Sequence, residues 1–131
     1  MALPNGAGGY QLGDGNLSEV VLVTSAIPTA YTAGATLTVA DLAGGMVVYT
    51  SSSTANLALP TAAATDAAFS SAKTYSSFDV SLIATSTGVP TITVGTGWTL
   101  VGVGTGVASK SVLFRAVKTG DATWSLYRIA G

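Results

Sequence analysis

The stretch SVLFRAV at Ser111–Val117 decides the fold class of this chain. Its second, fourth and sixth residues are apolar, so they share one face of an extended strand. Leu113 and Val117 make the opposite face apolar as well, with Arg115 between them. Apolar residues on both faces are expected of a strand that is covered on both sides, as at a subunit interface. The stretch therefore predicts a β-rich chain that takes part in an assembly.

Similar strand patterns occur along most of the chain. Phe78–Ala84 alternates apolar and polar residues, with Ile83 as a discordant apolar residue on the polar side. Further strands are predicted at Val20–Thr24, Ala35–Val39, Met46–Thr50, Leu57–Leu59, Thr91–Val94, Trp98–Val103 and Thr123–Ile129. Turn residues separate them, including Asp41–Gly45, and Lys118–Asp121 is predicted to form a hairpin turn. Short strands with this spacing are typical of a β-sandwich or a β-barrel.

A single helix interrupts the strand pattern. Thr61–Phe69 is rich in alanine, which favours helix, and Thr61 follows Pro60 as a plausible N-cap. We expect two or three helical turns that cover one end of the β core. No internal repeat and no linker between domains is apparent, so residues 19–131 are predicted to form one domain.

Residues 1–18 differ from the rest of the chain. Their glycines and Pro4 disfavour regular structure, which predicts an extended N-terminal arm. Four apolar side chains along this arm are candidate anchors on a partner surface: Leu3, Tyr10, Leu12 and Leu17.

The composition of the 131-residue chain favours an assembly component. Only 8% of the residues are charged, against about 25% in ordinary soluble domains, and 48% are hydrophobic. The net charge is −1, and the five cations, Lys73, Lys110, Arg115, Lys118 and Arg128, are scattered. We therefore expect neither direct nucleic-acid binding nor attachment to a membrane. No apolar run approaches the ~20 residues of a membrane helix.

Catalytic chemistry has few candidate residues. The chain has no histidine and no cysteine, which excludes imidazole and thiol chemistry. The six acids have no spacing that pairs them for acid–base work: Asp14, Glu19, Asp41, Asp66, Asp79 and Asp121. The segment Gly102–Ser111, counted from Gly104, resembles a phosphate-binding loop, but a strand pattern follows it where that loop needs a helix. Its glycines are therefore interpreted as strand ends and turn positions that need a positive φ. We expect no enzyme activity, no cofactor and no metal.

The aromatic residues allow two interpretations. They could form a carbohydrate-binding platform, or they could pack in the core or at an interface, which is the commoner use. The residues concerned are Tyr49, Phe78, Trp98, Phe114, Trp124 and Tyr127, which lie in or beside the predicted strands.

Several short motifs, in this order, resemble a known family. They are Gly15–Glu19 (GNLSE), Thr36–Leu42 (TLTVADL), Leu59–Ala63 (LPTAA), Thr93–Gly102 (TVGTGWTLVG), Phe114-Arg115, Lys118–Gly120 (KTG) and Leu126–Arg128 (LYR). The chain is similar, from about Gly15 to Arg128, to small decoration (cement) proteins of tailed-bacteriophage capsids, which tend to be encoded near the major capsid gene.

The resemblance implies an antiparallel, jelly-roll-like β-sandwich that forms a homotrimer on the quasi-threefold axes of a capsid. Such a protein is made in the host bacterial cytoplasm, binds the major capsid protein on the exterior of the virion and stabilises the shell. The family has no catalytic residues to transfer. The alternative is a phage head- or tail-fibre module that binds host glycans, for which exposed aromatic residues in a groove would be the distinguishing feature.

Overall fold

Two β-sheets and two helices make up the part of the chain that the structure, a computed structural model, describes: residues 26–131. The predicted N-terminal arm and the strand predicted at Val20–Thr24 lie outside these residues. The elements are β1 (Ala30–Tyr31), β2 (Ala35–Thr36), α1 (Val39–Gly44), β3 (Met46–Tyr49), β4 (Ala55–Ala58), α2 (Ala62–Ala68), β5 (Ser77–Ala84), β6 (Pro90–Thr93), β7 (Trp98–Val101), β8 (Ser111–Gly120) and β9 (Thr123–Ala130). The β-rich class predicted from the sequence is confirmed.

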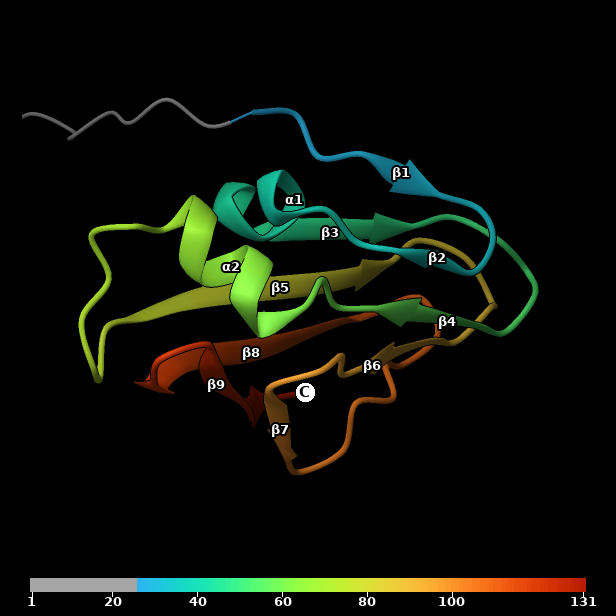
Figure 1. Cartoon of the computed structure of the whole chain (residues 1–131). Helices are drawn as coiled ribbons and strands as arrows, with labels where there is room; N and C mark the ends of the chain where they lie inside the picture. The colour runs from blue at the N-terminus through green and yellow to red at the C-terminus, as the bar shows by residue number, and fades with distance from the viewer. Residues whose placement is uncertain (1–25) are drawn as a thin grey trace, which may run out of the picture.

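The first six strands alternate between the two sheets. The larger sheet has the order β1-β3-β5-β8-β9-β7, and the smaller has the order β2-β4-β6. Figure 1 shows the two helices together at one end of the molecule and the smaller sheet toward the other. Each helix follows directly from a strand of the smaller sheet, because α1 begins three residues after β2 ends and α2 four residues after β4 ends.

The expectation of a wholly antiparallel arrangement is wrong. Within the larger sheet β1 pairs with β3 and β3 with β5 in parallel, and in the smaller sheet β2–β4 and β4–β6 are also parallel. The pair β7–β9 is parallel too, which leaves β5–β8 and β8–β9 antiparallel. The reason is that the chain crosses to the other sheet after each of these strands and returns in the same direction, as parallel pairing requires.

This path creates an internal repeat that the sequence did not reveal. A strand in the larger sheet, a strand in the smaller sheet and a helix occur twice, as β1–β2–α1 and β3–β4–α2. Equivalent leucines follow the second strand of each unit: the Leu37 amide donates to Ala58 at 2.7 Å and the Leu59 amide to Thr93 at 2.8 Å. The connecting segments differ in length between the units, so no fixed sequence period accompanies the repeat.

The segment Asp41–Gly45, predicted as a turn, belongs to helix α1 instead. The Thr38 side chain accepts a hydrogen bond from the Asp41 amide, and the Asp41 carboxylate accepts one from the Thr38 amide, which is a capping box. Gly45 ends the helix with φ of 76°. The strand predicted at Ala35–Val39 therefore shortens to β2. The second helix was predicted correctly, with Thr61 as the N-cap of α2.

The C-terminal hairpin is confirmed, with its turn shifted. Lys118–Gly120 continues strand β8, and the turn consists of Asp121 and Ala122, whose φ is 50°. Strand β7 ends two residues before the predicted Val103, where Gly102 adopts φ of 100°.

The core lies between the two sheets and under the helices. It is formed by Leu37, Leu42, Val47, Tyr49, Leu57, Leu59, Ala62, Val80, Leu82, Ile92, Trp98, Val112, Phe114, Ala116, Trp124 and Leu126. Both sheets and both helices contribute, so the smaller sheet and the helices together cover one face of the larger sheet. Burial of each large apolar side chain contributes roughly 1.5–3 kcal/mol. The prediction that Tyr49, Trp98, Phe114 and Trp124 pack internally is confirmed.

Candidate interaction surfaces

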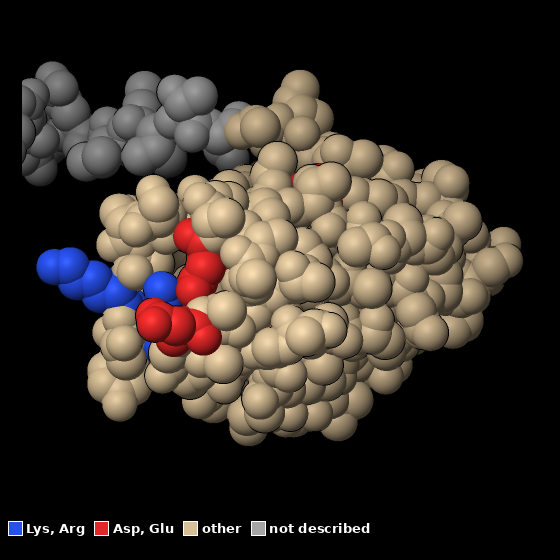
Figure 2. Space-filling model, viewed as in Figure 1, with Lys and Arg blue, Asp and Glu red and all other residues tan. Residues whose placement is uncertain are grey.

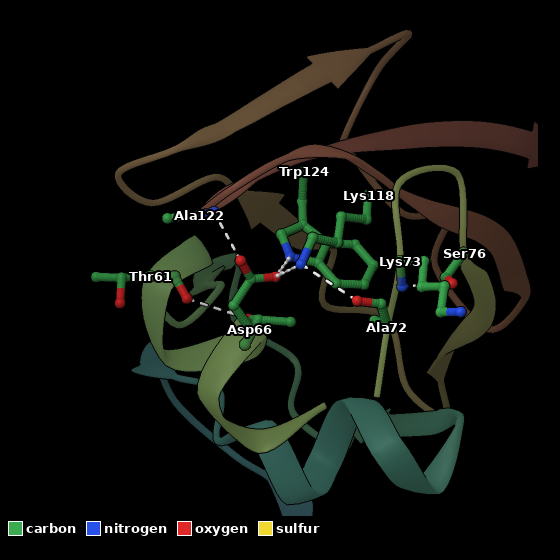
Figure 3. Close-up of polar contacts among 9 residues, drawn as sticks. Thr61, Asp66, Ala72, Lys73, Ser76, Lys118, Ala122 and Trp124 are labelled. Carbon is green, nitrogen blue, oxygen red and sulfur yellow. Dashed lines mark hydrogen bonds and ion pairs between the residues drawn. The ribbon is translucent and has the colours of Figure 1, made fainter. Parts of the chain in front are cut away.

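A partly buried polar cluster fastens helix α2 to the C-terminal hairpin (Figure 3). The Asp66 carboxylate accepts hydrogen bonds from the Trp124 indole Nε1 at 2.7 Å and from the Ala122 amide at 2.6 Å. Lys118 Nζ lies 3.1 Å from the same carboxylate and also contacts the Ala72 carbonyl at 3.4 Å. The cluster thus joins two segments that are more than fifty residues apart in the sequence.

The surroundings of Asp66 keep it ionised. Burial by itself would raise the pKa of this carboxyl, but hydrogen bonds from Ala122, Trp124 and Lys118, with the charge of Lys118, lower it below its usual value. The carboxylate is 19% exposed and has three donors. Its arrangement is that of a structural ion and not of a free general base.

Two other acids in the described residues are engaged in a similar way. Asp41 accepts hydrogen bonds from the Tyr31 hydroxyl and from the Thr38 amide. Asp79 pairs with Arg115 across strands β5 and β8, with Arg115 Nε 2.8 Å from the carboxylate. Among residues 26–131, no three acids gather in a way that could hold a metal ion.

An open groove of about 440 Å³ adjoins the polar cluster. The two helices, the loop after α2, the start of β5 and Trp124 line it, and its lining includes serines and the aromatic side chains of Phe69, Phe78 and Trp124. The rings pack edge to face, with centroids 5.1 Å apart for Phe69–Phe78 and 5.5 Å apart for Phe78–Trp124. Trp124 is only 1% exposed, so its ring face is used within the fold.

The larger sheet has a second face that points away from the smaller sheet, which we call the outer face. Residues that alternate with the core positions form it: Ala30, Met46, Val48, Ser77, Asp79, Ser81, Ile83, Thr99, Val101, Ser111, Leu113, Arg115, Val117, Ser125 and Tyr127. Of these, Ser125 is itself buried. Many of them are apolar, and no helix or strand within residues 26–131 packs on this side.

The smaller sheet provides an internal comparison. Its own outward-facing residues are Thr36, Asn56, Ala58, Thr91 and Thr93, which are small or polar. The outward face of the larger sheet is therefore the more apolar of the two. Water solvates the threonine-rich face well, whereas the outer face of the larger sheet resembles a surface that becomes covered.

Charged side chains are unevenly distributed over the surface. Figure 2 shows that those on the visible face gather at the end beside the helices, with almost none over the remainder. The outer face of the larger sheet has one acid and one base, Asp79 and Arg115, and they neutralise each other. The wide, nearly uncharged surfaces agree with the low charge content of the chain.

The structure places the sequence-predicted candidates as follows. The anchors Leu3, Tyr10, Leu12 and Leu17 lie outside the described residues. Of the glycines in the phosphate-loop-like segment, Gly102 has the positive φ that was predicted, but Gly104 does not. A side chain at Gly104 would lie 2.2 Å from the Ile92 carbonyl oxygen, so this glycine permits close contact between backbones.

The sequence pattern indicated the outward apolar residues of β5 and β8 but not those of β3. The double-sided pattern of Ser111–Val117 pointed to the outer face, and Ile83, the discordant residue of its strand, lies on it as well. The contribution of Met46 and Val48 was not recognised, because a four-residue strand shows too little alternation to separate two faces.

No family model, characterised protein or solved structure matches this chain. No helix within residues 26–131 has the length and apolar character needed to cross a membrane.

Proposed function

We propose that this chain is a virion structural protein, a decoration (cement) protein that binds the outer surface of the major capsid shell of a tailed bacteriophage and stabilises it. The observation that supports this proposal is the outer face of the larger sheet, where apolar side chains such as Leu113, Val117 and Tyr127 are covered by no other helix or strand of residues 26–131. A face of this kind is suited to an assembly and not to a free monomer. The viral setting comes from the resemblance of the sequence motifs.

The proposal includes a homotrimer in which the two sheets of each copy form a β-sandwich. Three copies would offer three identical contacts to neighbouring capsid subunits, and linked contacts bind far more strongly than one alone. The apolar anchors Leu3, Tyr10, Leu12 and Leu17 are proposed to bind the major capsid protein, so that the capsid exterior is the site of action.

The polar residues fit a structural role. Asp41, Asp66 and Asp79 each accept hydrogen bonds from donors within the fold. Their lowered pKa values mark ionised, engaged carboxylates and not a proton acceptor near neutral pH. We therefore propose no catalytic step and no cofactor.

The direct test mixes purified protein with undecorated capsids of a tailed phage whose genome encodes the chain. Electron microscopy should show ordered added density on the capsid exterior, and decorated capsids should resist heating better than bare ones. Capsids incubated with an unrelated trimeric protein provide the control. Absence of added density at saturating protein would contradict the proposal.

The groove beside α2 favours one alternative, a phage fibre module that binds host glycans. Serine hydroxyls around aromatic rings are groups that sugars can contact. The edge-to-face packing of Phe69, Phe78 and Trp124 weakens this alternative, because no broad ring face is offered for stacking. Binding of the protein to immobilised host glycans, abolished by Phe69→Ala, would support it over capsid attachment.

A further inference from the structure

The outer face of the larger sheet combines four features that point to one occupant. We propose that copies of this chain associate with one another through this face, with strands β5 and β8 at the centre of the contact. The inference deepens the proposed function, and it rests on that function for the homotrimer. It names the surface that joins the copies and leaves the helices and the smaller sheet outside the contact.

The first feature is the alternation along the strands. In β8, Val112, Phe114 and Ala116 are buried in the core, whereas Leu113 and Val117 point the other way and remain partly exposed. The same holds on either side of β8, for Ile83 in β5 and Tyr127 in β9. These apolar side chains therefore lie on the same side of neighbouring strands, interspersed with serines and with the Asp79–Arg115 pair.

The second feature is the contrast with the smaller sheet. Thr91 in β6 and Asn56 in β4 occupy outward positions there and are paired with each other in register. Threonine and asparagine are typical of a sheet face that contacts water. The larger sheet has Leu113, Val117 and Ile83 among its outward residues instead.

The third feature is charge. Asp79 and Arg115 are the charged residues of the outer face, their side chains are 44% and 49% exposed, and they pair at 2.8 Å. The face is therefore neutral as a whole and has an acid beside a base near its centre. A second copy brings the same two charges, so their dipoles can align without leaving a charge unpaired. A strongly charged partner would have no matching surface here.

The fourth feature is size. Strands spaced ~4.8 Å apart and rising ~3.3 Å per residue give six strands of these lengths a projected area of roughly 500–600 Å². The accessible area of a corrugated surface is larger than its projection, and a stable interface buries about 800 Å² on each partner. In a trimer this face is divided between two neighbours, so it provides part of the area that each contact requires.

The edge of the sheet extends the apolar area. Val101 at the end of edge strand β7 is 45% exposed, and Val103 and Ile129 beside it are 58% and 49% exposed. Arg128 holds this corner together by donating to the Val103 carbonyl at 2.9 Å. A neighbouring copy that lies on the outer face can therefore also cover this edge.

The experiment compares charge substitutions on the two outward faces in the full chain. Sedimentation velocity at micromolar concentration should show a trimer for the wild type and a monomer for Leu113→Lys. The control Thr91→Lys adds the same charge to the smaller sheet and should remain a trimer. Arg115→Glu, which changes an exposed side chain and leaves the core intact, should also give a monomer. Circular dichroism verifies that each variant is folded.

Cysteine variants give an independent readout, because the chain has no cysteine of its own. Among Ser81→Cys, Leu113→Cys and Val117→Cys, at least one should form a disulfide-linked dimer on mild oxidation. Thr91→Cys should stay unlinked. A wild-type monomer, a Leu113→Lys or Arg115→Glu variant that remains a trimer, or no cross-link in the outer-face panel would each overturn the inference.

Binding to capsids is measured separately, so the two proposals can fail independently. A wild-type trimer that dissociates on Leu113→Lys but never cosediments with capsids would leave this inference standing and defeat the decoration role. If the wild-type protein decorates capsids but the outer-face variants remain trimers, the decoration role stands and this inference fails.

Discussion

The carboxylate of Asp66 on helix α2 accepts a hydrogen bond of 2.7 Å from the indole nitrogen of Trp124 on strand β9. Trp124 is almost wholly buried and contacts three other aromatic rings. Its indole N–H needs an acceptor inside the fold, because water does not reach it. This carboxylate therefore helps to hold α2 over the larger sheet, together with the buried Ala62 and Thr65 of the helix.

Replacing Asp66 with alanine is expected to lower the free energy of unfolding by about 1–3 kcal/mol, because a buried donor loses its acceptor. Denaturant-induced unfolding measures the change. Asp121→Ala removes the same charge from the exposed β8–β9 turn and should change stability by less than about 0.5 kcal/mol. Equal effects of the two substitutions would show that the hydrogen bonds of Asp66 are unimportant.

The stability provided by Asp66 is expected to depend on pH. Burial opposes ionisation, but the hydrogen bonds and Lys118 outweigh it and lower the pKa of Asp66 in the folded state. The contribution is therefore complete above the unfolded-state pKa, about 3.9, and is lost as the pH falls through the lower folded-state pKa. The difference in unfolding free energy between wild type and Asp66→Ala should shrink below about pH 4. A constant difference down to the lowest pH would contradict this.

The stability that Tyr31 provides is expected to be lost at high pH instead of low pH. Burial, followed by the hydrogen bond to Asp41 and the negative charge of that residue, raises the pKa of Tyr31 to about 12. The stabilisation is present below the unfolded-state pKa of about 10 and is lost as the pH rises through the folded-state value. Tyr31→Phe should be less stable than wild type at neutral pH and should lack this loss. Tyr75→Phe, at a side chain that is 78% exposed, should retain the wild-type profile.

Two glycines should respond in opposite ways to alanine. Gly97 has φ of 88°, and a Cβ there would lie 2.6 Å from the Ala122 carbonyl oxygen. Gly97→Ala is therefore expected to destabilise the protein by about 1–3 kcal/mol. Gly44 lies in α1 with no atom within 4 Å of a Cβ. Gly44→Ala should stabilise by about 0.5–1 kcal/mol. Thermal unfolding distinguishes the two, and a shift of the same sign in both would be inconsistent with the geometry.

Deletion of residues 2–18 should leave thermal unfolding nearly unchanged and weaken capsid binding. Within residues 26–131 the buried apolar core begins at Leu37. Ordering the glycine-rich arm costs roughly 1–2 kcal/mol per residue, which only contacts with a partner surface can offset. Calorimetry and capsid cosedimentation test the two halves of this prediction. If the truncated chain does not fold, the arm belongs to the domain.

Properties that depend on a few neighbouring residues were predicted well. The strands β5, β8 and β9 follow from alternation, and α2 follows from its alanines and the Thr61 cap. Helix α1 was missed although the capping pair Thr38 and Asp41 was visible in the sequence. Gly44 and Gly45 favoured a turn at this point, but glycines also commonly end a helix, so they do not distinguish a turn from a helix C-terminus.

The sequence by itself thus determined most of the longer strands and helix α2, which side chains of β5 and β8 point inward, and that β8 has two apolar faces. Only the tertiary structure decided the parallel pairings, the repeated strand–strand–helix path, the partner of Asp66 and the extent of the outer face. The physical reason is distance along the chain. Alternation and capping act within a few residues, whereas Asp66 and Trp124 are 58 residues apart, and strand partners are selected by how the whole core packs.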